Sequence, residues 1–192
     1  MKQLIRVLGQ DPAFSNYGLC LVDVDAMTGE MFPVTVHLIE TKKSAIKTVR
    51  VSSDKLQRGR LISQIVREWE QECSIIAAEI PSGAQSASAA NALGIALGIV
   101  SGHTKPLIEV SAAEAKKAAT GYSDASKGDM VAWAYEQWPD LPWAKGRSKD
   151  MPDGLANKNE HMADALAIVK AAIKTQTFQS AAAMMVSMNN AA

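Results

Sequence analysis

Two apolar segments of this chain each end in a carboxylate, and this feature restricts how the chain can fold. The first, residues 7–11 (VLGQD), ends at Asp11, and the second, residues 75–79 (IIAAE), ends at Glu79. A later helical pattern contains Asp164, one turn after His161. Carboxylates at the ends of buried strands are costly to desolvate unless a cation compensates them. Because oxygen-ligated Mg²⁺ is such a cation and is typical of phosphoryl chemistry, the pattern indicates a metal-dependent nuclease.

The composition is that of a soluble globular protein. The 192 residues suffice for a sizeable core, 47% of them are hydrophobic, and 20 basic residues balance 20 acidic ones. Zero net charge argues against a general polycation but permits a local basic face for nucleic acid. Cys20 and Cys73 lie in apolar patterns without metal-ligand spacing, so we expect reduced core residues. With no signal-peptide pattern and no run of about 20 apolar residues, we expect a cytoplasmic protein, in a bacterial or phage-infected cell, that does not enter a membrane.

The periodicity of apolar residues predicts an α/β chain. Strands are expected at residues 3–10, 17–24, 34–39, 74–79 and 107–110. Helices are expected from Ser53 or Asp54 to about residue 73, over 84–101, from a capping box at 111–114, over 126–138, and over 159–174. The order βββαβαβ followed by helices predicts a mixed five-stranded sheet flanked by helices. We expect one domain over residues 1–175 and a poorly ordered tail over 176–192.

The predicted topology would bring the acids together. The first and fourth strands are expected neighbours, so Asp11 and Glu79 would meet at one edge of the sheet. The last predicted helix would supply His161 and Asp164, which share one helix face as residues i and i+3. These four groups could hold two divalent ions about 4 Å apart, one activating water and one stabilising the leaving oxygen. Glu160 is an alternative metal ligand. Taken singly, the four predicted ligands also fit ordinary structural roles, as a turn residue, a strand-edge residue or residues that cap a helix.

Several motifs in order resemble the RuvC-type Holliday junction resolvases of the RNase H-like superfamily. Each motif alone is weak, but their order is fairly specific, and together they extend from about residue 5 to about 172. They are residues 9–12 (GQDP) with 17–18 (YG), 78–79 (AE), 92–98 (ALGIALG), the spacing of Lys116, Gly121 and Lys127, and residues 161–168 (HMADALAI).

The resemblance implies an RNase H-like fold, a homodimer and paired nicking of four-way junctions or other branched DNA, without an organic cofactor. Asp11, Glu79 and Asp164 match the family's metal-binding acids, and His161 falls where members carry Asp or His. These four are the predicted catalytic and metal-binding residues, for Mg²⁺ or Mn²⁺ and two ions per site. An imidazole ligand would favour Mn²⁺. Lys116 and Lys127 match family lysines near the substrate phosphates, and we predict that they anchor the phosphate or stabilise its charge.

The chain also departs from the family. Ala13 stands where a glycine often follows Asp-Pro, and residues 80–83 (IPSG) lack the aromatic wedge of cellular resolvases. The departures suit a phage or mobile-element member and leave other substrates open. The alternatives are an RNase H-like nuclease acting on flap DNA or structured RNA, and a non-catalytic junction-binding protein.

Two basic clusters are candidate DNA contacts. Residues 42–60 contain seven basic side chains and one acid, Asp54, which describes either a DNA face or a solvated face. The predicted loop 139–157 carries a second cluster, Lys145, Arg147 and Lys149. Of the tryptophans, which fit core or interface positions as well, Trp143 is the best candidate for stacking on an unpaired base. The basic side chains of the first cluster are Lys42, Lys43, Lys47, Arg50, Lys55, Arg58 and Arg60.

Overall fold

A mixed five-stranded sheet forms the centre of the molecule, in the order β3-β2-β1-β4-β5. The computed structural model describes residues 2–80, 83, 86–146, 148–149 and 151–190. The predicted fold class is confirmed. The strands are β1 (Leu4–Asp11), β2 (Asn16–Asp25), β3 (Met31–Glu40), β4 (Ile75–Glu79) and β5 (Leu107–Val110). The helices are α1 (Val51–Gln71), α2 (Ala87–Ser101), α3 (Ala112–Thr120), α4 (Lys127–Gln137), α5 (Asn159–Ala172) and α6 (Gln176–Asn190), with a 3-10 turn at Pro152–Gly154.

The connections explain the mixed sheet. Short turns join β1, β2 and β3 into an antiparallel meander, as local pairing favours. Helix α1 carries the chain back so that β4 pairs parallel to β1, with Gln10 opposite Ala78 in the register. β5 then adds parallel to β4. The predicted adjacency of the first and fourth strands is confirmed, and their C-terminal ends lie at the same edge of the sheet.

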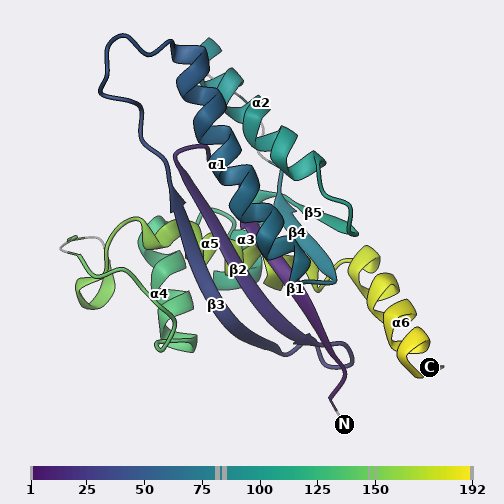
Figure 1. The fold of residues 1–192 in the computed structure, drawn as a ribbon. Helices are drawn as coiled ribbons and strands as arrows, with labels where there is room; N and C mark the ends of the chain where they lie inside the picture. The colour runs from purple at the N-terminus through teal and green to yellow at the C-terminus, as the bar shows by residue number, and fades with distance from the viewer. Residues whose placement is uncertain (1, 81–82, 84–85, 147, 150, 191–192) are drawn as a thin grey trace.

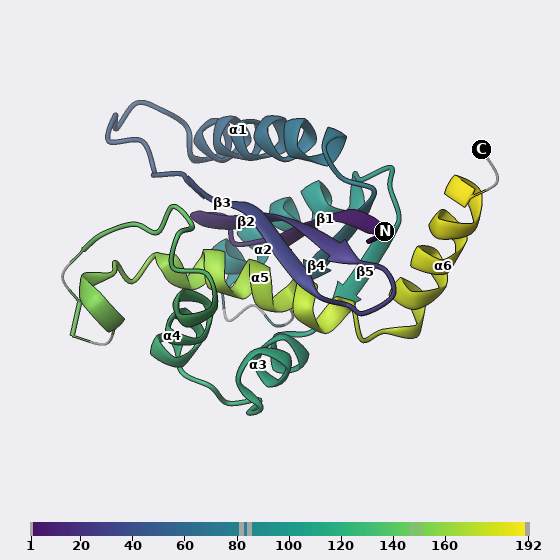
Figure 2. The same cartoon turned by 90° about the horizontal axis from the view of Figure 1, so that it is seen from below.

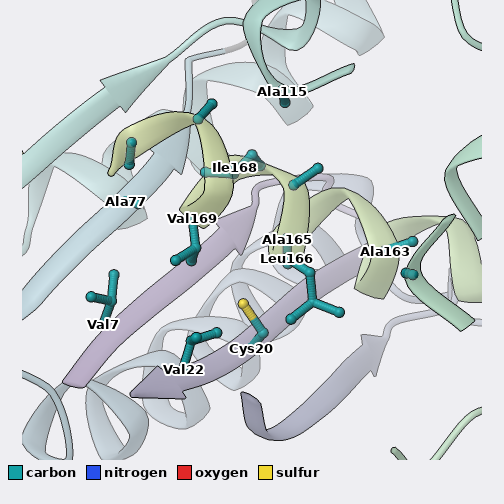
Figure 3. Packing of buried hydrophobic residues seen from close by; sticks show 14 of the residues in the cluster. Val7, Cys20, Val22, Ala77, Ala115, Ala163, Ala165, Leu166, Ile168 and Val169 are labelled. Atoms are coloured by element: carbon teal, nitrogen blue, oxygen red, sulfur yellow. The ribbon is translucent and has the colours of Figure 1, made fainter. Parts of the chain in front are cut away.

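Helices cover both faces of the sheet (Figures 1 and 2). On one face, α1 and α2 pack over a cluster that includes Leu8, Leu19 and Ile76. On the other face, α5 lies across the strands with α3 and α4 outside it, over a cluster that includes Val7 and Cys20. Figure 3 shows this second cluster, in which aliphatic side chains of α5 meet those of β1 and β2. Burial on both faces accounts for the nearly continuous apolar runs of β1 and β4.

Two glycines let α5 approach the sheet closely. A Cβ at Gly9 would lie 2.5 Å from the Ala165 carbonyl oxygen, and one at Gly18 would overlap the carbonyl oxygen of His161. Any side chain at either position would therefore push α5 away from β1 and β2. The glycines of the GQDP and YG motifs thus set the distance between the end of β1 and His161.

Some predicted boundaries differ from the structure. Helix α1 begins at Val51 without a side-chain cap. The side chain of Asp54, one of the two predicted caps, instead accepts a hydrogen bond from the backbone N–H of Ser44. The capping box at residues 111–114 is confirmed. Residues 176–190, expected to belong to a poorly ordered tail, form helix α6, which buries Phe178 against the second cluster. Among the described residues, no helix combines the length and apolarity needed to cross a membrane.

Candidate active site

Asp11 lies at the end of β1 and faces the first turn of α5. Its Oδ2 is 2.6 Å from His161 Nδ1, and both side chains are mostly buried. This contact joins residues that lie 150 positions apart in the chain. Burial acts to lower the pKa of His161, but the hydrogen bond and charge of Asp11 raise it above its ordinary value overall, helped by the charges of Glu160 and Asp164.

Glu79 ends β4, the strand beside β1. Burial and the charge of Asp11 raise the pKa of Glu79 to about 7, while the charge of Lys116 acts in the opposite direction. The electrostatic effect of Asp11 on Glu79 follows from the parallel pairing of their strands. A carboxyl with such a pKa is partly protonated at neutral pH, because the charge of Lys116 offsets only part of the effect of burial and of Asp11.

Asp164 lies one turn after His161 on α5 and interacts electrostatically with the residues described above. We call Asp11, Glu79, Asp164 and Glu160, together with His161, the acid cluster. Burial, followed by the charges of Asp11 and Glu79, raises the pKa of Asp164 to about 7. The charge of His161 partly offsets this effect, and that of Glu160 adds to it. The four predicted ligands are thus brought to one end of the sheet, although their roles remain predictions.

Glu160, which the sequence offered as an alternative ligand, takes part in the cluster. Its Oε1 accepts a hydrogen bond from Lys127 Nζ at 2.9 Å and lies 3.4 Å from His161 Nε2. Its Oε2 is buried and, within the described part of the chain, has no hydrogen-bond partner. The ion pair with Glu160 raises the pKa of Lys127. A buried carboxylate oxygen without a partner is uncommon and calls for an explanation.

The donor set fits a divalent cation, although the side chains are not arranged around one. Among the residues that the structure describes, no three His, Cys, Asp or Glu side chains are grouped closely enough to hold a metal ion. Carboxylate oxygens with one imidazole suit Mg²⁺ or Mn²⁺. A cation would also relieve the repulsion that raises the pKa values of Glu79 and Asp164, and it would satisfy a buried oxygen such as Glu160 Oε2.

The two predicted phosphate-binding lysines lie beside this cluster on different helices. Lys116 is half-buried on α3 and acts electrostatically on Glu79. Lys127 is the first residue of α4 and contacts Glu160 directly. Because α3 and α4 both pack on α5, the two lysines are held beside the helix that carries His161 and Asp164.

The predicted nucleic-acid contacts divide into exposed and structural residues. Lys42, Lys43, Lys47 and Arg50 are exposed in the segment before α1, and Arg60 is exposed on α1. Arg58 instead donates to Ser15 and to Thr41, and its guanidinium lies over the ring of Phe14. That side chain stabilises the β1–β2 turn rather than offering a free charge.

The second basic cluster and its tryptophan differ in exposure. Lys145 and Lys149 are both exposed, and the ammonium group of Lys145 lies over the ring of Tyr135. Arg147 lies outside the described residues. Trp143 is only 6% exposed, and its indole N–H donates to the carbonyl oxygen of Trp138. Trp143 is therefore a core residue, and its assignment as a base-stacking side chain is wrong.

Comparisons with known proteins identify the fold. No family model and no curated protein matches this chain. Thermus thermophilus RuvC in complex with a Holliday junction substrate aligns with a TM-score of 0.58 and 19% identity, over 87% of this chain and 92% of that one. The yeast mitochondrial Holliday junction resolvase aligns with a TM-score of 0.60 and 14% identity, over 96% and 83%. The fowlpox virus resolvase, in complex with Holliday junction DNA, aligns with a TM-score of 0.54 and 8% identity, over 88% and 97%. The chain therefore has a RuvC-like, RNase H-like fold.

Proposed function

We propose that this chain is a metal-dependent endonuclease that nicks Holliday junctions or related branched DNA. The observation that carries the proposal is the convergence of Asp11, Glu79 and Asp164 at one end of the sheet. Burial and mutual repulsion hold the pKa of both Glu79 and Asp164 at about 7. Such a cluster is unfavourable in a protein that only binds phosphate, because its carboxylates repel DNA.

Each residue of the cluster has a defined part in the proposed hydrolysis. Asp11, Glu79, His161 and Asp164 would hold one or two divalent ions. When bound, such ions supply a polarised phosphodiester and an activated water for in-line attack. Glu79 and Asp164 would have to lose their remaining protons to act as ligands, so metal loading depends on pH. His161 would have to exchange its contact with Asp11 for the ion.

Lys116 and Lys127 would bind the phosphate that is attacked. An ammonium group beside the acids offers donors to the non-bridging phosphate oxygens, whose charge grows in the transition state. The exposed lysines before α1, with Arg50 and Arg60, would follow the DNA backbone and make its binding depend on salt concentration. The resolvases of similar fold from Thermus thermophilus and fowlpox virus, each in complex with junction DNA, support branched DNA as the substrate.

A homodimer would match the two symmetric strands of a junction. The outer face of α2 supports this part of the proposal. Gly94 and Gly98 are exposed, and a Cβ at either would meet no atom within 4 Å, so packing within the chain does not require glycine at these positions. Leu93 and Leu97 on the same helix are only partly covered. Small and aliphatic residues on an open helix face allow a second copy to pack closely.

The test uses labelled substrates of matched sequence, namely a four-way junction, a flap, a linear duplex and a structured RNA, each with Mg²⁺, Mn²⁺ or EDTA. Symmetric nicks in the junction with metal, and none with EDTA, are the expected result. The Asp11→Asn variant should bind the junction and leave it uncut. Cleavage of flap DNA or RNA in preference to the junction would select the RNase H-like alternative suggested by the missing aromatic wedge. Tight junction binding without cleavage in either metal would leave only the non-catalytic reading.

A further inference from the structure

Lys127 has a fixed backbone but a side chain that reaches into solvent. It is the first residue of α4, whose start is held by a capping box between Ser126 and Asp129. The Lys127 side chain is 75% exposed, and its ammonium group is anchored by Glu160 Oε1 at 2.9 Å. An exposed lysine without such an anchor samples many rotamers, and ordering it on a ligand costs free energy.

Glu160 is held more firmly than the lysine it binds. Its side chain is only 13% exposed, on the first turn of α5 beside His161. Oε1 binds Lys127, whereas Oε2 is buried and lacks a partner among the described residues. A buried oxygen without a partner is destabilising, and an ion pair to an exposed lysine contributes little stability. Stability of the fold therefore does not account for a glutamate at this position.

We propose that Glu160 is a positioning residue that holds the Lys127 ammonium beside the acid cluster, ready to bind the substrate phosphate. The inference rests on the proposed nuclease function and adds the residue that orients one of its phosphate-binding groups. A lysine ammonium has three N–H donors, and Glu160 Oε1 occupies one of them. The other donors remain available for two phosphate oxygens, so the lysine can bind substrate without leaving Glu160.

The rival view is that Glu160 acts only as a negative charge near the DNA. Removing that charge would then strengthen DNA binding and leave cleavage equal or faster. The positioning role has the opposite consequence for turnover, because a mobile lysine binds the transition state less well. The two views therefore differ in the sign of the change in the cleavage rate.

A double-mutant cycle separates these views by single-turnover cleavage of the junction. Glu160→Gln should lower the rate constant roughly 3- to 10-fold, and Lys127→Met roughly 10- to 100-fold. The double variant should equal Lys127→Met, because Glu160 acts through the lysine. Glu160→Asp keeps the negative charge, so its rate constant should lie between that of Glu160→Gln and that of the wild type. Glu136→Gln makes the same chemical change at an exposed position of α4 and should leave the rate unchanged.

A second readout does not depend on cleavage. NMR of the lysine ammonium groups in the protein alone should report an ordered Lys127 in the wild type and a mobile one in Glu160→Gln. Independent, multiplying losses in the cycle, or a Lys127 equally ordered in both proteins, would overturn the positioning role while leaving the nuclease function intact. A wild-type protein that cuts no substrate would overturn the nuclease function itself, and with it any catalytic use of this ion pair.

Discussion

Gln10 and Asp11 are consecutive residues of β1, yet their side chains enter polar surroundings of opposite character. Gln10 is fully buried on the side of α1 and α2. Its Oε1 accepts a hydrogen bond from Tyr17 Oη at 2.6 Å, and its Nε2 lies 2.8 Å from His103 Nε2. His103 Nδ1 lies 2.9 Å from Glu70 Oε2. We call the set Tyr17, Gln10, His103 and Glu70 the buried polar chain.

The hydrogen bonds of the buried polar chain are mutually consistent. Because Gln10 Nε2 only donates, His103 Nε2 accepts, and the proton on Nδ1 is donated to Glu70. Thr104 donates to the other oxygen of Glu70 through its backbone N–H and its hydroxyl. Burial acts to raise the pKa of Glu70, but the hydrogen bonds from His103 and Thr104 lower it to about 2. The carboxylate is therefore stable in its charged form.

The acid cluster on the other side of β1 lacks this balance. There, the pKa of Glu79 and that of Asp164 are raised to about 7, and Glu160 Oε2 has no partner within the described residues. A satisfied polar network rigidifies a core, whereas an unsatisfied one requires a ligand or costs stability. The comparison teaches that similar side chains on one strand serve structure on one face and, in our proposal, chemistry on the other.

The sharpest test of this division is Asp164→Asn. If Asp164 is a metal ligand, as we propose, the variant should lose roughly 10³-fold or more of the cleavage rate, because several kcal/mol of transition-state stabilisation are removed. Its melting temperature at pH 8 should equal or exceed that of the wild type, because a repelled charge has been removed. Cleavage and thermal unfolding are measured side by side, with Asp140→Asn at an exposed position as the control. A large fall in melting temperature would show that the acid cluster is structural after all.

His103→Leu makes the reverse test on the buried polar chain. The variant leaves Gln10 Nε2 and Glu70 Oε2 without partners, so the free energy of unfolding should fall by about 2–4 kcal/mol. Urea denaturation measures this loss. The cleavage rate per folded molecule should remain within about twofold of the wild type, since His103 contacts none of the acids in the cluster. If cleavage fell sharply while stability remained, the two regions would be coupled and the division would fail.

The sequence predicted most of the fold because periodicity and topology rules act locally. The alternation of short apolar runs with helical patterns was enough to predict the mixed sheet and the pairing of β1 with β4. It misjudged α6, because small residues and methionines give a weak helical pattern, and the burial of Phe178 depends on the rest of the chain. The start of α1 was misjudged because the side chain of Asp54 bonds to a preceding loop instead of capping the helix.

The convergence of Asp11, Glu79, His161 and Asp164 was predictable because each lies at a strand end or on one helix face. The partners of single side chains were not predictable. The contact of Lys127 with Glu160 and the burial of Trp143 depend on how α4 and the loop after it pack on α5. No spacing in the sequence reports such contacts between helices.

Adding a divalent cation should compensate the charges of the acid cluster and so make it more similar to the balanced buried polar chain. Without metal, Glu79 and Asp164 contribute stability that is fully present below about pH 4, their unfolded pKa, and is lost as the pH rises through their folded pKa of about 7. Mg²⁺ or Mn²⁺ at 100 times Kd should add about 2.7 kcal/mol, or roughly 5–10 °C in melting temperature. At one fixed ion concentration, the shift in melting temperature should be larger at pH 8 than at pH 5.5, because deprotonation of the ligands lowers Kd. An equal shift in Asp11→Asn would show binding elsewhere.

Tyr17→Phe gives the smallest expected effect and tests the place where the two regions come closest. Burial, followed by the charge of Asp11, raises the pKa of Tyr17, so this ring lies within electrostatic reach of the acid cluster although its hydroxyl belongs to the buried polar chain. Removing the hydroxyl leaves Gln10 Oε1 unpaired and should lower the free energy of unfolding by about 1 kcal/mol. The cleavage rate and its pH profile should be unchanged, because the donated proton points to Gln10 and not to Asp11. A shifted pH profile with near-normal stability would mean that the hydroxyl affects the pKa values of the acids. Tyr17 would then belong to the acid cluster and not to the buried polar chain.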